Sequence, residues 1–114
     1  MRKIFISATA PLMMLLGSVA EAAPYQALAS WYGPGFYGNL TANGEIYTGQ
    51  ELTVAHKTLP FGTRLRVCYD SCVTVRVNDR GPYIGAREFD LSQKAAETIG
   101  LLHNGVDFVS VEPI

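Results

Sequence analysis

The sequence has 114 residues, enough for one domain, and carries nine Lys or Arg residues against ten Asp or Glu residues. This balance excludes a strongly basic protein that neutralises phosphates, so we expect no nucleic-acid partner. The only two cysteines, Cys68 and Cys72, have no further Cys or His close by in sequence, which argues against a zinc site. We therefore expect no metal, and no motif in the sequence implies a cofactor.

Residues 1–22 have the pattern of a secretory signal peptide: a basic start, an apolar run at 4–19 and a small-x-small site, Ala20-Glu21-Ala22. The run is shorter than the roughly 20 residues that a membrane span needs, and Pro11 interrupts it. We expect cleavage before Ala23 and a mature domain at 23–114. This domain would be exported to the periplasm or the medium, without a stable membrane anchor.

The first predicted strand runs from Tyr25 to Tyr32 and ends at Gly33-Pro34-Gly35. A polar loop follows, up to Gly44. Aromatic side chains gather where the strand ends, and two interpretations are open. They form an exposed platform on which sugar rings stack, or they fill the core of a small barrel. These residues are Trp31, Tyr32, Phe36 and Tyr37.

A second short strand, Leu52 to His56, ends in a histidine, which in such a place is more often structural than catalytic. Alternating residues at 64–67 and 73–76 then predict a hairpin. Cys68 and Cys72 face each other across its three-residue loop and should form a disulfide in an oxidising compartment. The closed loop is small, so we expect a contribution of at most about 2 kcal/mol.

The stretch from Val75 to Ser92 concentrates charged and turn-forming residues in an otherwise apolar segment. They either hold the turn at 78–82 in shape or form a functional site. The alternation of a strand places Glu88 and Asp90 on one face, with Phe89 opposite in the core. Two like charges on one face would raise the pKa of a carboxyl group, as a general acid requires.

A short helix is predicted from Ser92, its N-cap, to Gly100, its C-terminal stop. A last strand follows at 106–111. About six short strands and one helix within the expected mature chain predict a mainly β fold, a small closed or nearly closed barrel.

Five ordered motifs closely resemble the rare lipoprotein A (RlpA) family. They are ASWYG (29–33), TANGE (41–45), LTVAHKTLPFGT (52–63), VNDRGP (77–82) and FDLS (89–92). The resemblance covers about residues 27–111 and implies a six-stranded double-psi β-barrel. Members of the family include septal-ring lytic transglycosylases that cut peptidoglycan glycan strands. The same barrel occurs in expansins, barwin-type proteins and some cellulases.

The resemblance also implies site residues. Glu45, His56 and Asp90 match the motif positions expected to carry the chemistry. We expect six further residues to bind substrate: Trp31, Tyr32, Tyr47, Asn78, Asp79 and Arg80. Of these, Asp79 and Arg80 match the family's DRGP motif and would shape the floor of the site, while Trp31 and Tyr32 would stack on glycan rings. One departure is Thr48, at a position where catalytic members tend to have an aspartate; Glu51 follows three residues later.

The resulting hypothesis is a lytic transglycosylase that acts on peptidoglycan as a monomer. In such a reaction the 6-hydroxyl of muramic acid attacks, so one acid that then turns base can suffice. Asp90 or Glu45 would be that group, and His56 would position a carboxyl or bind the sugar. The alternative is a non-catalytic wall binder or loosener of the expansin kind, which Thr48 favours.

Overall fold

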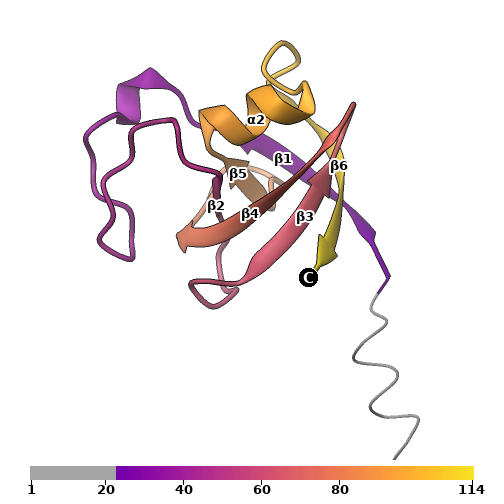
Figure 1. Ribbon diagram of the computed structural model, residues 1–114, viewed down its shortest axis with the longest axis horizontal. Coiled ribbons are helices and arrows are strands. Elements are labelled where there is room, and N and C mark those ends of the chain that lie inside the picture. Colours follow the sequence, from indigo (N-terminus) through magenta and orange to yellow (C-terminus); the bar gives the residue numbers. More distant parts are fainter. Residues whose placement is uncertain (1–22) are drawn as a thin grey trace, which may run out of the picture.

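The computed structural model describes residues 23–114; the expected signal peptide at 1–22 lies outside the described residues. The described part folds into a closed six-stranded barrel with one α-helix across it (Figure 1). The prediction of a mainly β barrel is thereby confirmed. No helix in this part is long and apolar enough to cross a membrane. The elements are β1 (Tyr25–Trp31), a 3-10 turn (Pro34–Phe36), β2 (Thr53–Ala55), β3 (Arg64–Cys68), β4 (Cys72–Asp79), β5 (Phe89–Leu91), α2 (Gln93–Ile99) and β6 (Val106–Pro113).

The strand order around the barrel is β1-β5-β2-β4-β3-β6, and β6 closes the barrel by pairing with β1. β1 pairs with β5 in parallel, as β2 does with β4, and the other four pairings are antiparallel. The short β5 is therefore inserted between β1 and β2, far from its neighbours in sequence. This insertion places the FDLS motif in the middle of the sheet.

The core follows the alternation of the strands, because every second side chain points inward. On β4, Val75 and Val77 are buried, while Thr74 and Arg76 lie on the outer face and are only partly buried. On β5, Phe89 and Leu91 are buried on either side of Asp90. The predicted alternation of Phe89 and Asp90 is confirmed.

The helix has the predicted ends. The Ser92 hydroxyl accepts a hydrogen bond from the Ala95 N–H at 3.2 Å, and Gly100 adopts a left-handed conformation with φ of 88°. Ala95 and Ile99 are fully buried against the barrel. Ser92 also donates to the Glu51 carbonyl at 2.5 Å, so the start of the helix holds the segment that leads into β2.

The β3–β4 hairpin is closed by the predicted disulfide between Cys68 and Cys72, which lie directly opposite each other. Its loop is docked on the helix, because the Asp70 N–H donates to the Ile99 carbonyl at 3.0 Å. At the other side of the barrel, the segment between β1 and β2 leaves the sheet and forms a long excursion beside it (Figure 1). This excursion carries Glu45.

Candidate functional site

Asp90 lies in the middle of a row of residues that crosses four strands. It is paired with Ser30 on β1 at one side and with Ala55 on β2 at the other. Ala55 is in turn paired with Asp79 on β4. The sheet register thus brings the aspartates of two sequence motifs onto neighbouring parts of one surface.

Asp90 sits in an environment that favours its protonated form. Burial raises the pKa of its carboxyl group, and the nearby Asp79 charge adds to the increase. The Ser30 hydroxyl, which donates to Asp90 Oδ1 at 3.0 Å, and the charge of Arg87 oppose the shift without cancelling it. A raised carboxyl pKa is the direction of shift that a general acid requires.

The sequence predicted the direction of this shift but named the wrong neighbour. Glu88 was expected to raise the pKa of Asp90, yet Asp79 supplies the like charge. The Glu88 carboxylate instead accepts hydrogen bonds from Tyr25 Oη and His56 Nε2, both at 3.3 Å. Glu88 is therefore engaged by its own partners.

His56 contacts Glu88, and no hydrogen bond joins it to Glu45 or Asp90 in the described part of the chain. Its Nδ1 accepts hydrogen bonds from the N–H groups of Thr58 and Leu59, both at 3.1 Å. Nδ1 must then be unprotonated, which leaves Nε2 as the donor to Glu88. His56 thus shapes the loop after β2 and positions a carboxylate, but that carboxylate is Glu88.

Glu45 is held by a clamp of three side chains. Arg76 binds it with both nitrogens, at 2.7 and 2.9 Å, and the side-chain amides of Asn78 and Asn43 donate at 2.9 and 3.2 Å. The bonds from Arg76, followed by that from Asn78, lower the pKa of Glu45 to about 2. Glu45 is therefore a permanent carboxylate near neutral pH and does not serve as a proton donor there.

Asp79 and Asn78 anchor the loop that carries Glu45. Asp79 Oδ1 accepts from the N–H groups of Ala42 and Arg80, both at 2.9 Å. The Asn78 carbonyl accepts from the Asn43 N–H at 3.2 Å. The end of β4 therefore fixes the TANGE motif against the barrel.

Arg80 makes contacts of its own with the loop after β2. Its Nη1 donates to the His56 carbonyl at 3.2 Å, and its guanidinium lies 3.9 Å from the centre of the Phe61 ring. These contacts agree with a role in shaping the floor of the site.

Thr48 stands where catalytic members of the family tend to have an aspartate, and the structure places a carboxylate beside it. Glu51 accepts hydrogen bonds from the Thr48 N–H at 3.2 Å and from the Thr48 hydroxyl. Burial raises the pKa of Glu51, but the bonds from Thr48 and the backbone outweigh it, so the pKa is lowered overall. A negative charge is therefore present next to position 48.

Two tyrosines that we expected to bind substrate are buried. Tyr32 and Tyr47 are only 7% and 2% exposed, and their ring centres lie 4.4 Å apart. The Tyr47 hydroxyl donates to the Tyr32 carbonyl at 2.7 Å and accepts from the Gln93 N–H at 2.9 Å. Both rings fix the excursion to the barrel, so the interpretation as an exposed sugar platform is wrong for Tyr32. Trp31 is half-buried and packs against the core.

Sequence reasoning missed the side chains that donate hydrogen bonds to these two carboxyl groups, Arg76 to Glu45 and Ser30 to Asp90. Alternation does place both on the outer face of their strands, but their partners lie 31 and 60 residues away along the chain. Spacing within one strand does not show such pairings. In residues 23–114 no three Cys, His, Asp or Glu side chains gather as a metal site would require.

The sequence of this chain is similar to those of known proteins. A family model described as lytic transglycolase matches residues 25–111. The probable endolytic peptidoglycan transglycosylase RlpA of Synechocystis sp. is 52% identical over 88 residues, which cover 75% of this chain and 27% of that protein. The chain belongs to the RlpA family. The endolytic peptidoglycan transglycosylase RlpA of Campylobacter jejuni is 46% identical over 107 residues, covering 91% of this chain and 37% of the relative. The chain thus spans well under half of the length of these RlpA proteins.

Solved structures with little sequence identity share the fold. The Streptomyces papain inhibitor superposes with a TM-score of 0.64 at 22% identity, covering 80% of this chain and 94% of the inhibitor. An expansin of Clavibacter michiganensis, solved as a D78N mutant with cellohexaose, gives 0.64 at 19% identity, covering 80% of this chain and half of the expansin. The predicted double-psi β-barrel of the RlpA family is confirmed.

We predict that Asp90→Asn stabilises the fold at neutral pH. A carboxyl whose pKa is raised on folding contributes stability that is present below its ordinary pKa of 3.8 and lost as pH rises through the folded value. Asparagine avoids that loss and keeps the acceptor for Ser30. Urea unfolding at pH 7 should show a gain of about 1 kcal/mol or less that disappears near pH 3.

Asp107→Asn is the matched control for this measurement, because a hydrogen bond from Tyr69 lowers the pKa of Asp107. Its effect should have the opposite sign at pH 7. An Asp90→Asn protein that is less stable than wild type at pH 7 would contradict the assignment of Asp90 as a destabilising charge.

We predict that Glu45→Gln destabilises the fold at pH 7. A depressed pKa contributes stability that is present above the ordinary value of 4.5 and lost as pH falls toward about 2. The pair with Arg76 is partly exposed, so we expect a loss of about 1 kcal/mol. The difference from wild type should shrink below pH 4.5 in thermal melts. Glu97→Gln, which removes an exposed pair with Lys94 at 3.9 Å, should change little at any pH.

Proposed function

We propose that this protein is a peptidoglycan lytic transglycosylase that cuts the β-1,4 bond between N-acetylmuramic acid and N-acetylglucosamine, leaving a 1,6-anhydro end. The observation that carries the proposal is the contrast between two carboxyl groups: the pKa of Asp90 is raised by its surroundings, and the pKa of Glu45 is lowered to about 2. Environments that push two carboxyl pKa values apart are typical of glycosidic-bond cleavage. Membership of the RlpA family, whose named relatives are endolytic peptidoglycan transglycosylases, supports the same reaction.

In the proposed mechanism, Asp90 gives its proton to the oxygen that leaves as the bond to C1 of muramic acid breaks. The Asp79 carboxylate, near enough to raise the pKa of Asp90, favours the positive charge that develops on the sugar ring. The ionised Asp90 then takes the proton of the 6-hydroxyl as its oxygen bonds to C1. This second transfer restores the acid and needs no water.

The other polar residues hold this arrangement in place. Ser30 orients Asp90 through a hydrogen bond at 3.0 Å. Glu45 binds Arg76 and Asn78, and so fixes the loop that borders the site on the β4 side. In this proposal Glu45 is a positioning residue, and Trp31 remains a candidate contact for a sugar ring.

We predict that the purified protein releases anhydro-ended fragments from peptidoglycan. Mass spectrometry of the soluble products should detect them with wild type and show a loss of at least about 100-fold for Asp90→Asn, as expected for a general acid. Glu45→Gln should reduce the rate. Asp107→Asn, on β6 outside the site, should leave it unchanged.

The same experiment separates the two candidate functions. If wild type yields no soluble product yet sediments with the cell wall, the protein is a non-catalytic binder of the kind that Thr48 favours. If Asp90→Asn remains fully active, the protein is an enzyme whose acid is a different residue.

We further propose that the protein is exported, cleaved before Ala23 and active as a monomer in the periplasm or the medium. The disulfide between Cys68 and Cys72 supports this, because such bonds persist in oxidising compartments. N-terminal sequencing of the protein recovered outside the cytoplasm should start at Ala23, and gel filtration should show one chain. A recovered protein that still begins at Met1 would contradict the cleavage.

A further inference from the structure

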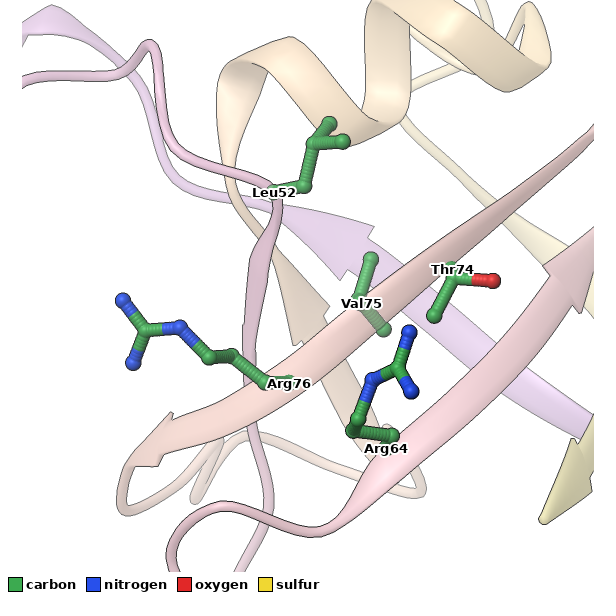
Figure 2. Close-up of a pocket in the computed structure, with 5 residues that line it drawn as sticks. All are labelled: Leu52, Arg64, Thr74, Val75 and Arg76. Atoms are coloured by element: carbon green, nitrogen blue, oxygen red, sulfur yellow. The ribbon is translucent and has the colours of Figure 1, made fainter. Parts of the chain in front are cut away.

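A pocket of about 300 Å³ opens on the outer face of β3 and β4, next to the clamp on Glu45. It is lined by Leu52, Arg64, Thr74, Val75 and Arg76 (Figure 2). Neither the catalytic hypothesis nor the family motifs use Arg64 or Thr74. The pocket therefore needs an explanation of its own.

Arg64 and Arg76 lie directly opposite each other on the antiparallel strands β3 and β4. Like charges in such positions are destabilising. Their guanidinium groups point in different directions: that of Arg64 lies toward Thr74, while that of Arg76 extends away from the strand (Figure 2). Glu45 neutralises Arg76, but within residues 23–114 no carboxylate lies within 4.0 Å of Arg64. The pocket thus contains a cation without a partner in the fold.

This positive charge is local. Residues 23–114 hold seven Lys or Arg and nine Asp or Glu residues, so the domain as a whole is slightly acidic. The neighbouring Arg66, also on the outer face of β3, is paired with Glu112 at 3.8 Å. Arg64 differs from it in having no such pair and in lining a pocket. A general excess of basic residues does not account for the site.

The side chains around the pocket suit a carboxylate on a sugar. A guanidinium binds a carboxylate with two parallel hydrogen bonds. Leu52, which is 42% exposed, offers an apolar wall against which the C–H groups of a ring or a methyl group can pack. The combination of one free cation and one apolar wall fits an acidic sugar better than a purely neutral glycan.

We propose that this pocket binds a carboxylate carried by the peptidoglycan substrate, with Arg64 as the principal contact. The proposal rests on the function proposed above and names the group that the same protein recognises outside the bond it cuts. The path from Asp90 on β5 to Arg64 on β3 crosses β2 and β4. It consists of three steps between neighbouring strands and a shift of two to three residues along them. That is roughly 15–20 Å over the barrel surface. The carboxylate therefore belongs to a part of the strand a few sugar units from the reacting bond.

Two parts of peptidoglycan carry such a group. One is the lactyl carboxylate of muramic acid, which is free where the stem peptide has been removed. The other is a carboxylate of the stem peptide itself. Both present the same chemistry to Arg64, and substrates that contain one or the other distinguish them.

The test measures binding of wild type, Arg64→Gln and the control Arg66→Gln by calorimetry, on three soluble glycan preparations. These are peptide-bearing strands, amidase-stripped strands, and stripped strands whose carboxylates have been converted to methylamides. Arg64→Gln should raise the Kd for carboxylate-bearing strands about three- to tenfold, and Arg66→Gln less than twofold. Methylamidation should weaken wild type by the same factor as Arg64→Gln and remove the difference between the two proteins. The difference should also shrink as salt is added.

A thermal melt tests whether Arg64→Gln weakens binding only by destabilising the fold. Because the opposed arginines repel each other, Arg64→Gln should melt at or above the wild-type temperature. Weakened binding together with a lowered melting temperature would assign Arg64 to the fold and overturn the proposal.

The remaining outcomes are also decisive. An Arg64→Gln effect on stripped strands identifies the lactyl carboxylate, and an effect confined to peptide-bearing strands identifies the stem peptide. Equal binding by Arg64→Gln and Arg66→Gln on all preparations overturns the subsite, whether or not the protein is an enzyme. If wild type releases no anhydro product but binds strands through their carboxylates, the catalytic function fails and the subsite stands.

Discussion

The insertion of β5 between β1 and β2 is the constraint on which the rest of the structure depends. This strand has only three residues, and burial of Phe89 and Leu91 in the core leaves one outward position, that of Asp90. Parallel pairing with β1 then places Ser30 beside Asp90, and antiparallel pairing with β2 brings Asp79 close across Ala55. Packing and chemistry are therefore linked. A change that loosened Phe89 in the core would also move the carboxyl group on which the proposed reaction depends.

The fold also places the two carboxyl groups of the site in surroundings that shift their pKa values in opposite directions. Partial burial and the nearby Asp79 charge raise the pKa of Asp90, and the hydrogen bond from Ser30 opposes this rise only in part. Glu45 has a bidentate arginine and two amide donors, so its ionised form is favoured. Sequence motifs present both as candidate acids, but only the pKa of Asp90 is shifted in the direction that the proposed acid requires. Glu45 has a positioning role, because the hydrogen bonds that favour its ionised form also hold its loop against β4.

Much of the barrel could be predicted from the sequence, because it follows from local patterns. Alternation identified the strands, Ser92 and Gly100 marked the ends of the helix, and the cysteine spacing showed the hairpin. What failed depends on contacts distant in sequence. Glu88 was expected to act on Asp90 because the two share a strand, whereas Asp79 acts across two strand pairings. Tyr32 was a candidate for an open platform because it borders a loop, and Tyr47 was expected to bind substrate. Whether a loop folds back onto the barrel depends on bonds such as the one that joins these two residues.

Thr48 shows how a departure in sequence can be compensated in space. The hydroxyl of Thr48 donates to Glu51, and its N–H donates to the same carboxylate, so the residue that lacks a charge anchors one. The backbone of Glu51 is fixed as well, because its carbonyl accepts a hydrogen bond from Ser92, two residues after Asp90. Glu51 is thereby tied to the same short segment that carries the proposed acid. Loss of an aspartate from one position of a motif therefore does not remove negative charge from this part of the molecule. For this reason Thr48 weighs less against catalysis in the structure than it does in the sequence.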